Sequence, residues 1–361
     1  MKKLTIEELV PGMTIATDVY TYNDQLILPK GLVLTDKSIT RLRFYSISYI
    51  NIEDNFVNNS FPFNKEEDKP TAYSDSLKSK AVFNEFKSCF EDTIHSFSNT
   101  MINLVEHNSD IDTNLLLEQT LAIFKINNGD FNLFNMLHNL RTYDDDTFAH
   151  SINVSLICNV FATWLNMNAE DVKTATLAGL LHDIGKLKIP DTIVHKPARL
   201  TESEYEIIKT HPTEGYRILQ SMNINQHVKN AALMHHERCN GSGYPLGLVG
   251  DQIDPIAKLV SIVDVYEATT APRIYRGPLS PFEVIGLFQS EGIQKYDVLY
   301  IMTFLENIVN TYMHYGVVLN DGTEGTIIFI NKQDLSRPII RSGNRFIDLT
   351  ANPTLSIVRI I

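Results

Sequence analysis

The placement of histidine constrains this chain more than any other feature of its sequence. Five of its eleven histidines lie in four short segments, which are AHSINVS, LLHDIGK, KTHPTEGY and LMHHERCNGSGYP. A fifth segment, KLVSIVDVYEATT, carries one carboxylate, Asp264, inside an otherwise apolar helical pattern. A fold that uses these residues together has to bring five separate segments to one place. The histidines are His150, His182, His211, His235 and His236.

Imidazole and carboxylate groups together suit divalent transition metals such as iron, manganese, nickel and zinc. His182 and Asp183 end an apolar helical run, and Gly185 is expected to stop that helix. The pair would then lie at a helix end, where both side chains can reach a shared cavity. Two adjacent metal ions sharing a carboxylate can hold a phosphate and activate a water molecule for attack on it.

Asp264 is flanked by isoleucine and valine, and a buried carboxylate needs a positive partner. A metal ion is one such partner. The alternative is an ordinary ion pair with Lys258 or Arg273.

A single buried histidine is more often a packing residue than a metal ligand, so the interpretation depends on the whole set. His211 precedes Pro212 and could simply begin a helix. Six histidines are assigned to the surface or to packing: His95, His107, His138, His195, His227 and His314.

The chain of 361 residues is long enough for two or three domains. Its pattern predicts a mainly α fold with small β-rich segments at both ends, and Asn320-Asp321-Gly322 predicts a hairpin in the last segment. The predicted parts are a β-rich domain over 1–55, a polar linker over 56–76, a helical connector over 77–129, a helical domain with the histidines over 130–312, and a β-rich segment over 313–361.

The formal net charge of −12 argues against duplex nucleic acid as a partner, because such binding needs a basic face. A small anionic substrate held by local cations or metals is compatible with it. No apolar run reaches the about 18 residues that span a bilayer, and the first residues do not resemble a signal peptide. Three scattered cysteines, Cys89, Cys158 and Cys239, indicate reduced thiols, so a cytoplasmic location is expected.

These motifs resemble the HD-GYP family, a branch of the HD-domain metal-dependent phosphohydrolases. HDIGK matches at Asp183 and Lys186, and HHERCNGSGYP matches at Gly243, Tyr244 and Pro245. The resemblance covers roughly residues 130–310, and the order of HD, an isolated histidine, HHE, GYP and a later aspartate is specific. It implies a helical HD-domain bundle as the fold and residues 130–312 as the catalytic domain.

The resemblance also implies roles for individual residues. Asp183 would bridge two divalent transition metal ions, with iron or manganese expected and nickel or zinc as alternatives. Lys186, Arg273 and Arg276 would bind the substrate phosphates, beside the GYP residues Gly243, Tyr244 and Pro245. The implied metal ligands are His150, His182, Asp183, His211, His235, His236 and Asp264.

The chain departs from the family pattern at three places: Asn240 and Glu267 stand where aspartate is frequent, and Ala271–Ile274 stands where Ser-Asp-Arg-Pro is frequent. These positions bear on substrate preference more than on metal binding. Family members with three metals carry a glutamate one turn before the first histidine, and this chain has the shorter Asp146 there. Two metals are therefore expected, with Asp146 as the candidate ligand of a third.

The implied activity is a metal-dependent phosphodiesterase that hydrolyses cyclic di-GMP to pGpG, and to GMP after a second turnover. One alternative is a phosphodiesterase for another cyclic dinucleotide, such as 3',3' cyclic GMP-AMP. The other is a degenerate receptor that binds a cyclic dinucleotide without cutting it. The expected partners beyond the substrate are a second copy of the chain and a diguanylate cyclase that binds the GYP loop.

Overall fold

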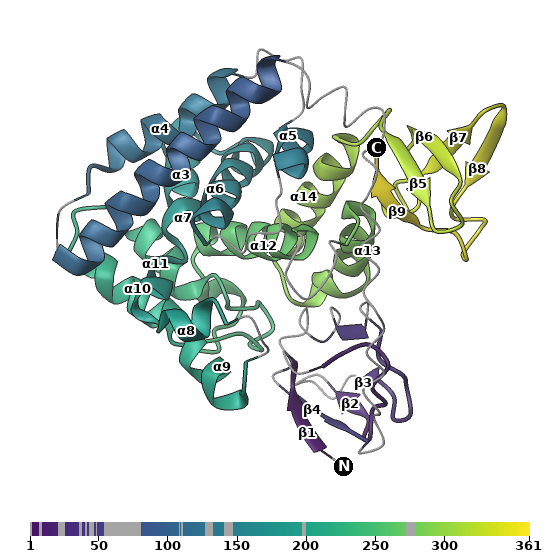
Figure 1. Ribbon diagram of the computed structural model, residues 1–361, viewed down its shortest axis with the longest axis horizontal. Helices are drawn as coiled ribbons and strands as arrows, with labels where there is room; N and C mark the ends of the chain where they lie inside the picture. Colours follow the sequence, from purple (N-terminus) through teal and green to yellow (C-terminus); the bar gives the residue numbers. More distant parts are fainter. Residues whose placement is uncertain are drawn as a thin grey trace. The chain divides into compact units, whose positions relative to one another are not determined.

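The chain forms two compact units in a computed structural model, shown in Figure 1. The first unit comprises residues 1–69 and 189–211, and the second comprises 70–188 and 212–361. The structure describes residues 2–6, 9–20, 26–35, 38–39, 42, 47, 49–53, 81–107, 109, 111–126, 133–140, 147–196, 200–271 and 279–361.

The described residues of the first unit include four short β-strands and the short helices α8 and α9. Strand β1 pairs antiparallel with β4, and β2 pairs antiparallel with β3. Apolar side chains form its core, and among them Ile15, Leu34 and Leu42 are at most 1% exposed. The elements are β1 (Lys2–Thr5), β2 (Val19–Tyr20), β3 (Leu26–Leu28), β4 (Tyr49–Ile52), α8 (Asp191–Val194) and α9 (Glu202–Ile208).

The second unit is mainly helical and carries most of the predicted ligands. Helix α6 packs against α7 and α12, and α11 packs against the same two helices. Its helices are α3 (Ala81–His107), α4 (Thr113–Ile126), α5 (Leu133–Leu140), α6 (Thr147–Trp164), α7 (Ala169–Leu181), α10 (His211–Gln220), α11 (Gln226–Met234), α12 (Pro255–Thr270), α13 (Pro281–Glu291) and α14 (Val298–Asn310), with 3-10 turns η2 (Ile184–Lys188), η3 (Gly250–Gln252) and η4 (Gly292–Gln294).

Helix α12 lies at the centre of this bundle because its sequence is apolar on nearly every side. Its start is fixed by Asp254, whose side chain accepts the backbone N–H of Ile256, and by Pro255 in the first turn. The helix ends at Thr270, as expected from Pro272. A helix buried in this way holds any polar side chain it carries in the interior.

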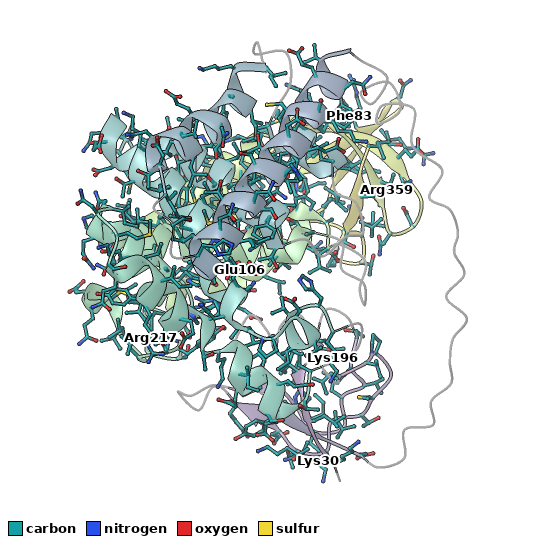
Figure 2. All side chains as sticks on the ribbon, turned by 60° about the vertical axis from the view of Figure 1, so that its left-hand side comes forward. Lys30, Phe83, Glu106, Lys196, Arg217 and Arg359 are labelled. Atoms are coloured by element: carbon teal, nitrogen blue, oxygen red, sulfur yellow. The ribbon has the colours of Figure 1, made fainter. Side chains whose placement is uncertain are left out.

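Some charged side chains, such as Glu106 on α3 and Arg217 on α10, lie on the outer faces of the helices (Figure 2). Both residues are exposed. None of the helices in the described parts of the chain is long and apolar enough to cross a membrane.

The C-terminal residues form a five-stranded antiparallel sheet in the order β8-β7-β6-β5-β9. The predicted hairpin at Asn320-Asp321-Gly322 is confirmed, with Gly322 at φ +84° between β5 and β6. The sheet packs on α13 through β9, where the Ser280 hydroxyl donates to the Ile357 carbonyl at 2.6 Å. The strands are β5 (Gly316–Leu319), β6 (Glu324–Phe329), β7 (Ile339–Ser342), β8 (Arg345–Asp348) and β9 (Ile357–Ile360).

The predicted mainly α fold with small β-rich ends is confirmed. The expected role of Gly185 is wrong, because α7 already ends at Leu181 and Gly185 lies inside the 3-10 turn η2. The predicted linker at 56–76 lies outside the described residues, and the five-part division of the chain stays a prediction.

Gly179 allows α6 and α7 to cross closely. A Cβ atom at this position would lie 2.9 Å from Ser155 Cα and 3.0 Å from Cys158 Sγ. The first of these neighbours is backbone, so a larger side chain would force the helices apart.

We therefore expect Gly179→Ala to destabilise the protein by about 1–3 kcal/mol through overpacking. Thermal unfolding of the two proteins measures the difference. Lys173→Ala, on an exposed position of the same helix, is the control and should change stability by at most about 0.5 kcal/mol. Equal stability of wild type and Gly179→Ala would show that the two helices can separate freely.

Candidate metal centre

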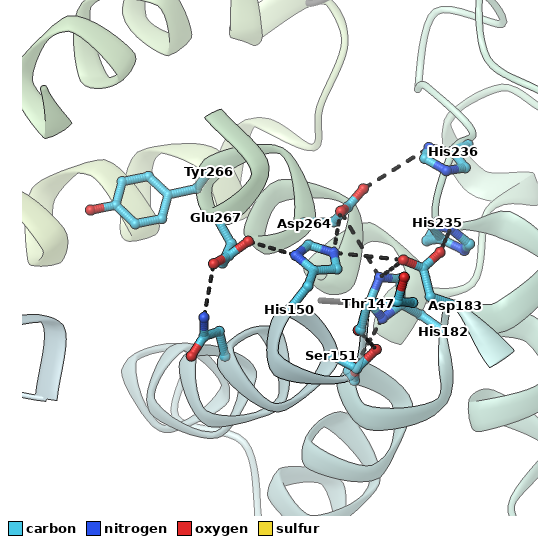
Figure 3. A network of polar contacts seen from close by, with 12 residues as sticks. Thr147, His150, Ser151, His182, Asp183, His235, His236, Asp264, Tyr266 and Glu267 are labelled. Atoms are coloured by element: carbon cyan, nitrogen blue, oxygen red, sulfur yellow. Dashed lines mark hydrogen bonds and ion pairs between the residues drawn. The ribbon is translucent and has the colours of Figure 1, made fainter. Parts of the chain in front are cut away.

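The predicted ligands come from five helices of the fold. His150 and Asp264 lie within α6 and α12, while the others lie at helix ends. His182 and His235 are the C-terminal caps of α7 and α11. Asp183 and His236 directly follow them in the sequence. His211 begins α10, whose remaining nine residues belong to the helical unit. Figure 3 shows how six of these side chains converge from the helices of the bundle.

The side chains form three overlapping groups that could hold metal ions, within each of which the ligand atoms lie no more than 4.8 Å apart. His182 and His235 each belong to two groups, so the groups are neighbours. The groups are His150 with His182 and Asp264, His182 with Asp183 and His235, and His211 with His235 and His236.

Backbone carbonyls orient three of the histidines. A carbonyl oxygen only accepts, so the Nδ1 atom facing it must carry the hydrogen, and Nε2 is left with a lone pair for a metal. In each case the carbonyl belongs to the preceding turn of the chain. The Nδ1 contacts are His182 to Gly179 at 2.7 Å, His211 to Ile208 at 2.7 Å and His235 to Ala231 at 3.0 Å.

His150 is oriented by a carboxylate instead. Its Nδ1 atom lies 2.5 Å from Glu267 Oε2, and its Nε2 atom lies 3.2 Å from Asp264 Oδ1. Burial lowers the pKa of His150, but the charges and hydrogen bonds of Glu267 and Asp264 outweigh it and raise this pKa to about 9. A proton therefore competes with a metal ion for His150, as expected of a metal ligand.

Asp264 has histidines for partners. Its Oδ1 atom lies 3.9 Å from His182 Nε2, in addition to the His150 contact. Burial raises the pKa of Asp264, but the hydrogen bond from His150 and the charges of the surrounding histidines hold it well below its usual range. The alternative pairing with Lys258 is wrong, because that lysine binds Asp297 at 3.2 Å. Arg273, the other alternative, lies outside the described residues.

Asp183 presents its two oxygens to different histidines. Oδ2 lies 3.4 Å from His182 Nε2 and Oδ1 lies 3.7 Å from His235 Nε2. The Lys186 ammonium group donates to Oδ2 at 2.6 Å. This is the geometry expected of a carboxylate shared by two neighbouring sites.

The donor set fits divalent transition metals. His182 is fully buried, and its Nε2 atom makes no hydrogen bond with any described residue, which is costly without a ligand. Neutral imidazoles combined with carboxylates are typical of such metal sites. The histidine–aspartate cluster can therefore hold metal ions.

The GYP loop folds back over the HHE segment. The Tyr244 ring stacks on His236 with centroids 4.6 Å apart, and its backbone N–H donates to the His236 carbonyl at 3.2 Å. The peptide bond between Tyr244 and Pro245 is cis. The buried Glu237 carboxylate accepts the N–H groups of Leu246 at 2.7 Å and Leu248 at 2.9 Å. Glu237, which directly follows the predicted ligand His236, thus holds the GYP loop against the HHE segment.

Sequence reasoning missed the roles of Glu237 and Glu267. Glu237 was part of a quoted motif, and Glu267 was noted only as a departure from the family pattern. The signal for Glu267 is a carboxylate in an apolar, buried segment, the same signal that identified Asp264, whereas Glu237 lies in a polar segment that gives no such signal. Three predicted residues, Asp146, Arg273 and Arg276, lie outside the described residues.

Comparison with known proteins identifies the class of this helical unit. Residues 134–298 match the HD domain. An HDG"Y"P protein from Bdellovibrio bacteriovorus has a similar fold, with a TM-score of 0.50 and 19% identity over 85% of this chain and 99% of that one. Residues 134–298 therefore form an HD domain, and the fold of the chain is similar to that of the Bdellovibrio protein.

Three curated relatives are more similar in sequence. A 3'3'-cGAMP-specific phosphodiesterase of Vibrio cholerae is 44% identical over 145 residues, 40% of this chain and 34% of that protein. A cyclic di-GMP phosphodiesterase of Pseudomonas aeruginosa is 40% identical over 147 residues, 40% of this chain and 36% of that protein. A cyclic di-GMP phosphodiesterase of Thermotoga maritima is 36% identical over 198 residues, 53% of each chain.

The chain spans between a third and about half of the length of these relatives. The resemblance to HD-GYP proteins predicted from the motifs is confirmed.

Gly243 is required by the close approach of the GYP loop to the HHE segment. A Cβ atom here would lie 2.4 Å from Glu237 Cα and 2.5 Å from Arg238 N, and neither backbone atom can move aside. We expect Gly243→Ala to displace Tyr244 from His236, which would lower both the melting temperature and the metal content. Calorimetry and elemental analysis of the purified variant measure the two effects. Leu246→Ala, on a side chain that is 58% exposed, should change neither; an unaltered Gly243→Ala protein would contradict the loop geometry.

Proposed function

We propose that this protein is a metal-dependent phosphodiesterase that hydrolyses cyclic di-GMP to pGpG, and then to GMP in a second turnover. The observation that carries the proposal is the convergence of the histidine and aspartate ligands around Asp183 in an HD domain. The names of the relatives in Pseudomonas and Thermotoga support the substrate.

Two divalent transition metal ions, iron or manganese before nickel or zinc, are proposed to bind here. Asp183 would be shared, with His150, His182 and Asp264 toward one ion and His211, His235 and His236 toward the other. When bound, such a pair supplies a Lewis acid for the phosphate and a water of lowered pKa. Asp146 would serve as a ligand only if a third ion binds.

The side chains of this protein would bind and orient the substrate. Lys186 is 28% exposed, so its ammonium group can reach a phosphate oxygen while it stays close to Asp183. Arg273 and Arg276 follow the end of α12 and would bind phosphate or guanine by paired hydrogen bonds. Gly243, Tyr244 and Pro245 would form the loop wall of the site.

A second candidate substrate is 3',3' cyclic GMP-AMP. The relative in Vibrio cholerae, 44% identical over its match, is named for that activity. Both substrates would use the same metal site, so the difference would lie in the base contacts. A receptor that never cuts its ligand has no physical need for seven metal ligands, which argues against that third function.

Two protein partners are proposed, a second copy of the chain and a diguanylate cyclase. The GYP loop supports the second, because Leu246 and Val249 on it are 58% and 48% exposed. Residues 130–312 are proposed as the catalytic domain.

Asp183→Ala tests the metal centre. The wild-type chain should bind two metal ions. We expect Asp183→Ala to abolish hydrolysis and to lower the metal content, because the shared carboxylate would bind both ions. Elemental analysis and product chromatography measure the two quantities on one sample. The matched control is the exposed His195→Ala, which should alter neither. Full activity of Asp183→Ala, or fewer than one metal per loaded wild-type chain, would contradict the assigned centre.

A panel of cyclic dinucleotides tests the substrate. Anaerobically iron- or manganese-loaded protein should convert cyclic di-GMP to pGpG faster than it converts 3',3' cyclic GMP-AMP. Faster turnover of the hybrid dinucleotide would establish the second candidate, and binding of both without any product would establish the receptor.

Arg273 and Arg276 test substrate binding separately from metal binding. Charge-assisted contacts contribute roughly 1.5–3 kcal/mol each, or about 10- to 150-fold. Replacing both by alanine should lower the catalytic efficiency by at least that factor and leave the metal content unchanged, since arginine is not a ligand. Unchanged steady-state kinetics would remove both residues from the site, and loss of metal would indicate damage to the fold.

A further inference from the structure

We propose that Glu267 is a positioning residue that, through His150, makes one of the two metal positions bind its ion more tightly than the other. This inference rests on the proposed binuclear metal centre. It concerns residues that the family resemblance did not assign to any role.

The first observation is the kind of acceptor that faces Nδ1 in four of the five histidines. His182, His211 and His235 donate their Nδ1 hydrogens to uncharged backbone carbonyls. The Nδ1 hydrogen of His150 goes to the Glu267 carboxylate at 2.5 Å. A carboxylate acceptor makes the opposite nitrogen a stronger donor to a metal than a carbonyl does, and it fixes the ring plane.

The second observation is that Glu267 is itself held in place. Asn153 donates its amide hydrogen to Glu267 Oε1 at 2.9 Å, which leaves Oε2 for His150. Glu267 and Asn153 are 2% and 8% exposed, so little water screens the contact. Asn153 lies one turn after His150 on α6. Glu267 lies one turn after Asp264 on α12, and both are labelled in Figure 3. The two helices that supply His150 and Asp264 therefore also supply the residues that support them.

The third observation is the distribution of charge. The group on the His150 side contains Asp264 and has Glu267 behind it, whereas the group of His211, His235 and His236 contains only imidazoles, and Asp264 Oδ2 approaches it no closer than 4.0 Å, at His236 Nδ1. Asp183 is common to both sides and does not distinguish them. A divalent cation is therefore attracted more strongly to the His150 side, and the ions should bind in two distinct steps.

The experiment is a titration of the metal-free full-length protein with cobalt(II), whose visible absorption reports each ligand environment. Wild type should show two steps of unequal affinity. Glu267→Gln keeps the shape of the side chain and removes its charge, so the tighter step should weaken by about 10- to 100-fold while the weaker step is unchanged. Asn153→Ala, which frees Glu267 to turn away, should weaken the same step by a smaller factor.

Asp254→Asn is the matched control. Asp254 also accepts from a histidine Nδ1 and an asparagine amide, those of His227 and Asn230, at the other end of α12. This variant should destabilise α12 about as much as Glu267→Gln does, and it should leave the affinities of both cobalt-binding steps unchanged.

The proposal is overturned if both cobalt-binding steps of Glu267→Gln have the same affinity as in wild type. It is also overturned if Glu267→Gln and Asp254→Asn each weaken the two steps to the same extent. A wild-type protein that takes up no cobalt would instead refute the metal centre itself. Should Glu267→Gln fail to fold, an unchanged tighter step in Asn153→Ala overturns the proposal.

Discussion

The burial of negative charge inside an apolar helical bundle is the constraint on which this structure depends. Asp183, Asp264 and Glu267 are each less than 10% exposed, on or between helices whose other side chains are largely apolar. Isolated carboxylates in such a place would cost several kcal/mol each. Each of these carboxylates faces a histidine, whose positive or hydrogen-bonding ring offsets the cost of burying the negative charge. The cluster forms where α6, α7, α11 and α12 pack together.

Helix ends give the cluster its geometry. A side chain just beyond the last turn, such as His182 or His235, can point along the helix axis into a space that residues within the helix cannot reach. The same position leaves the carbonyls of the last turn available as acceptors for Nδ1. The GYP loop closes over this region because Gly243 lets its backbone touch that of the HHE segment.

Much of the site could be predicted from the sequence because its residues are polar or charged and stand in otherwise apolar helical segments. Asp264 in an apolar helix and His182-Asp183 after an apolar run are visible in one dimension, and the hairpin at Gly322 follows from turn chemistry. Glu267 carries the same signal as Asp264, but its partner could not be assigned from the sequence, since His150 is 117 positions away and only packing brings the two together. The end of α7 was misplaced because a 3-10 turn, with no distinct sequence pattern, follows it directly.

The carbonyl contacts of His182, His211 and His235 have a consequence for how the protein acquires its metals. Each ring is aligned by its own chain segment, within three or four residues, and needs no ion to hold it. These three histidines are therefore preorganised for metal binding by the fold itself. The proposed metal ions would therefore exchange without rearrangement of the helical bundle, and their identity would follow from which divalent metal is available more than from the fold.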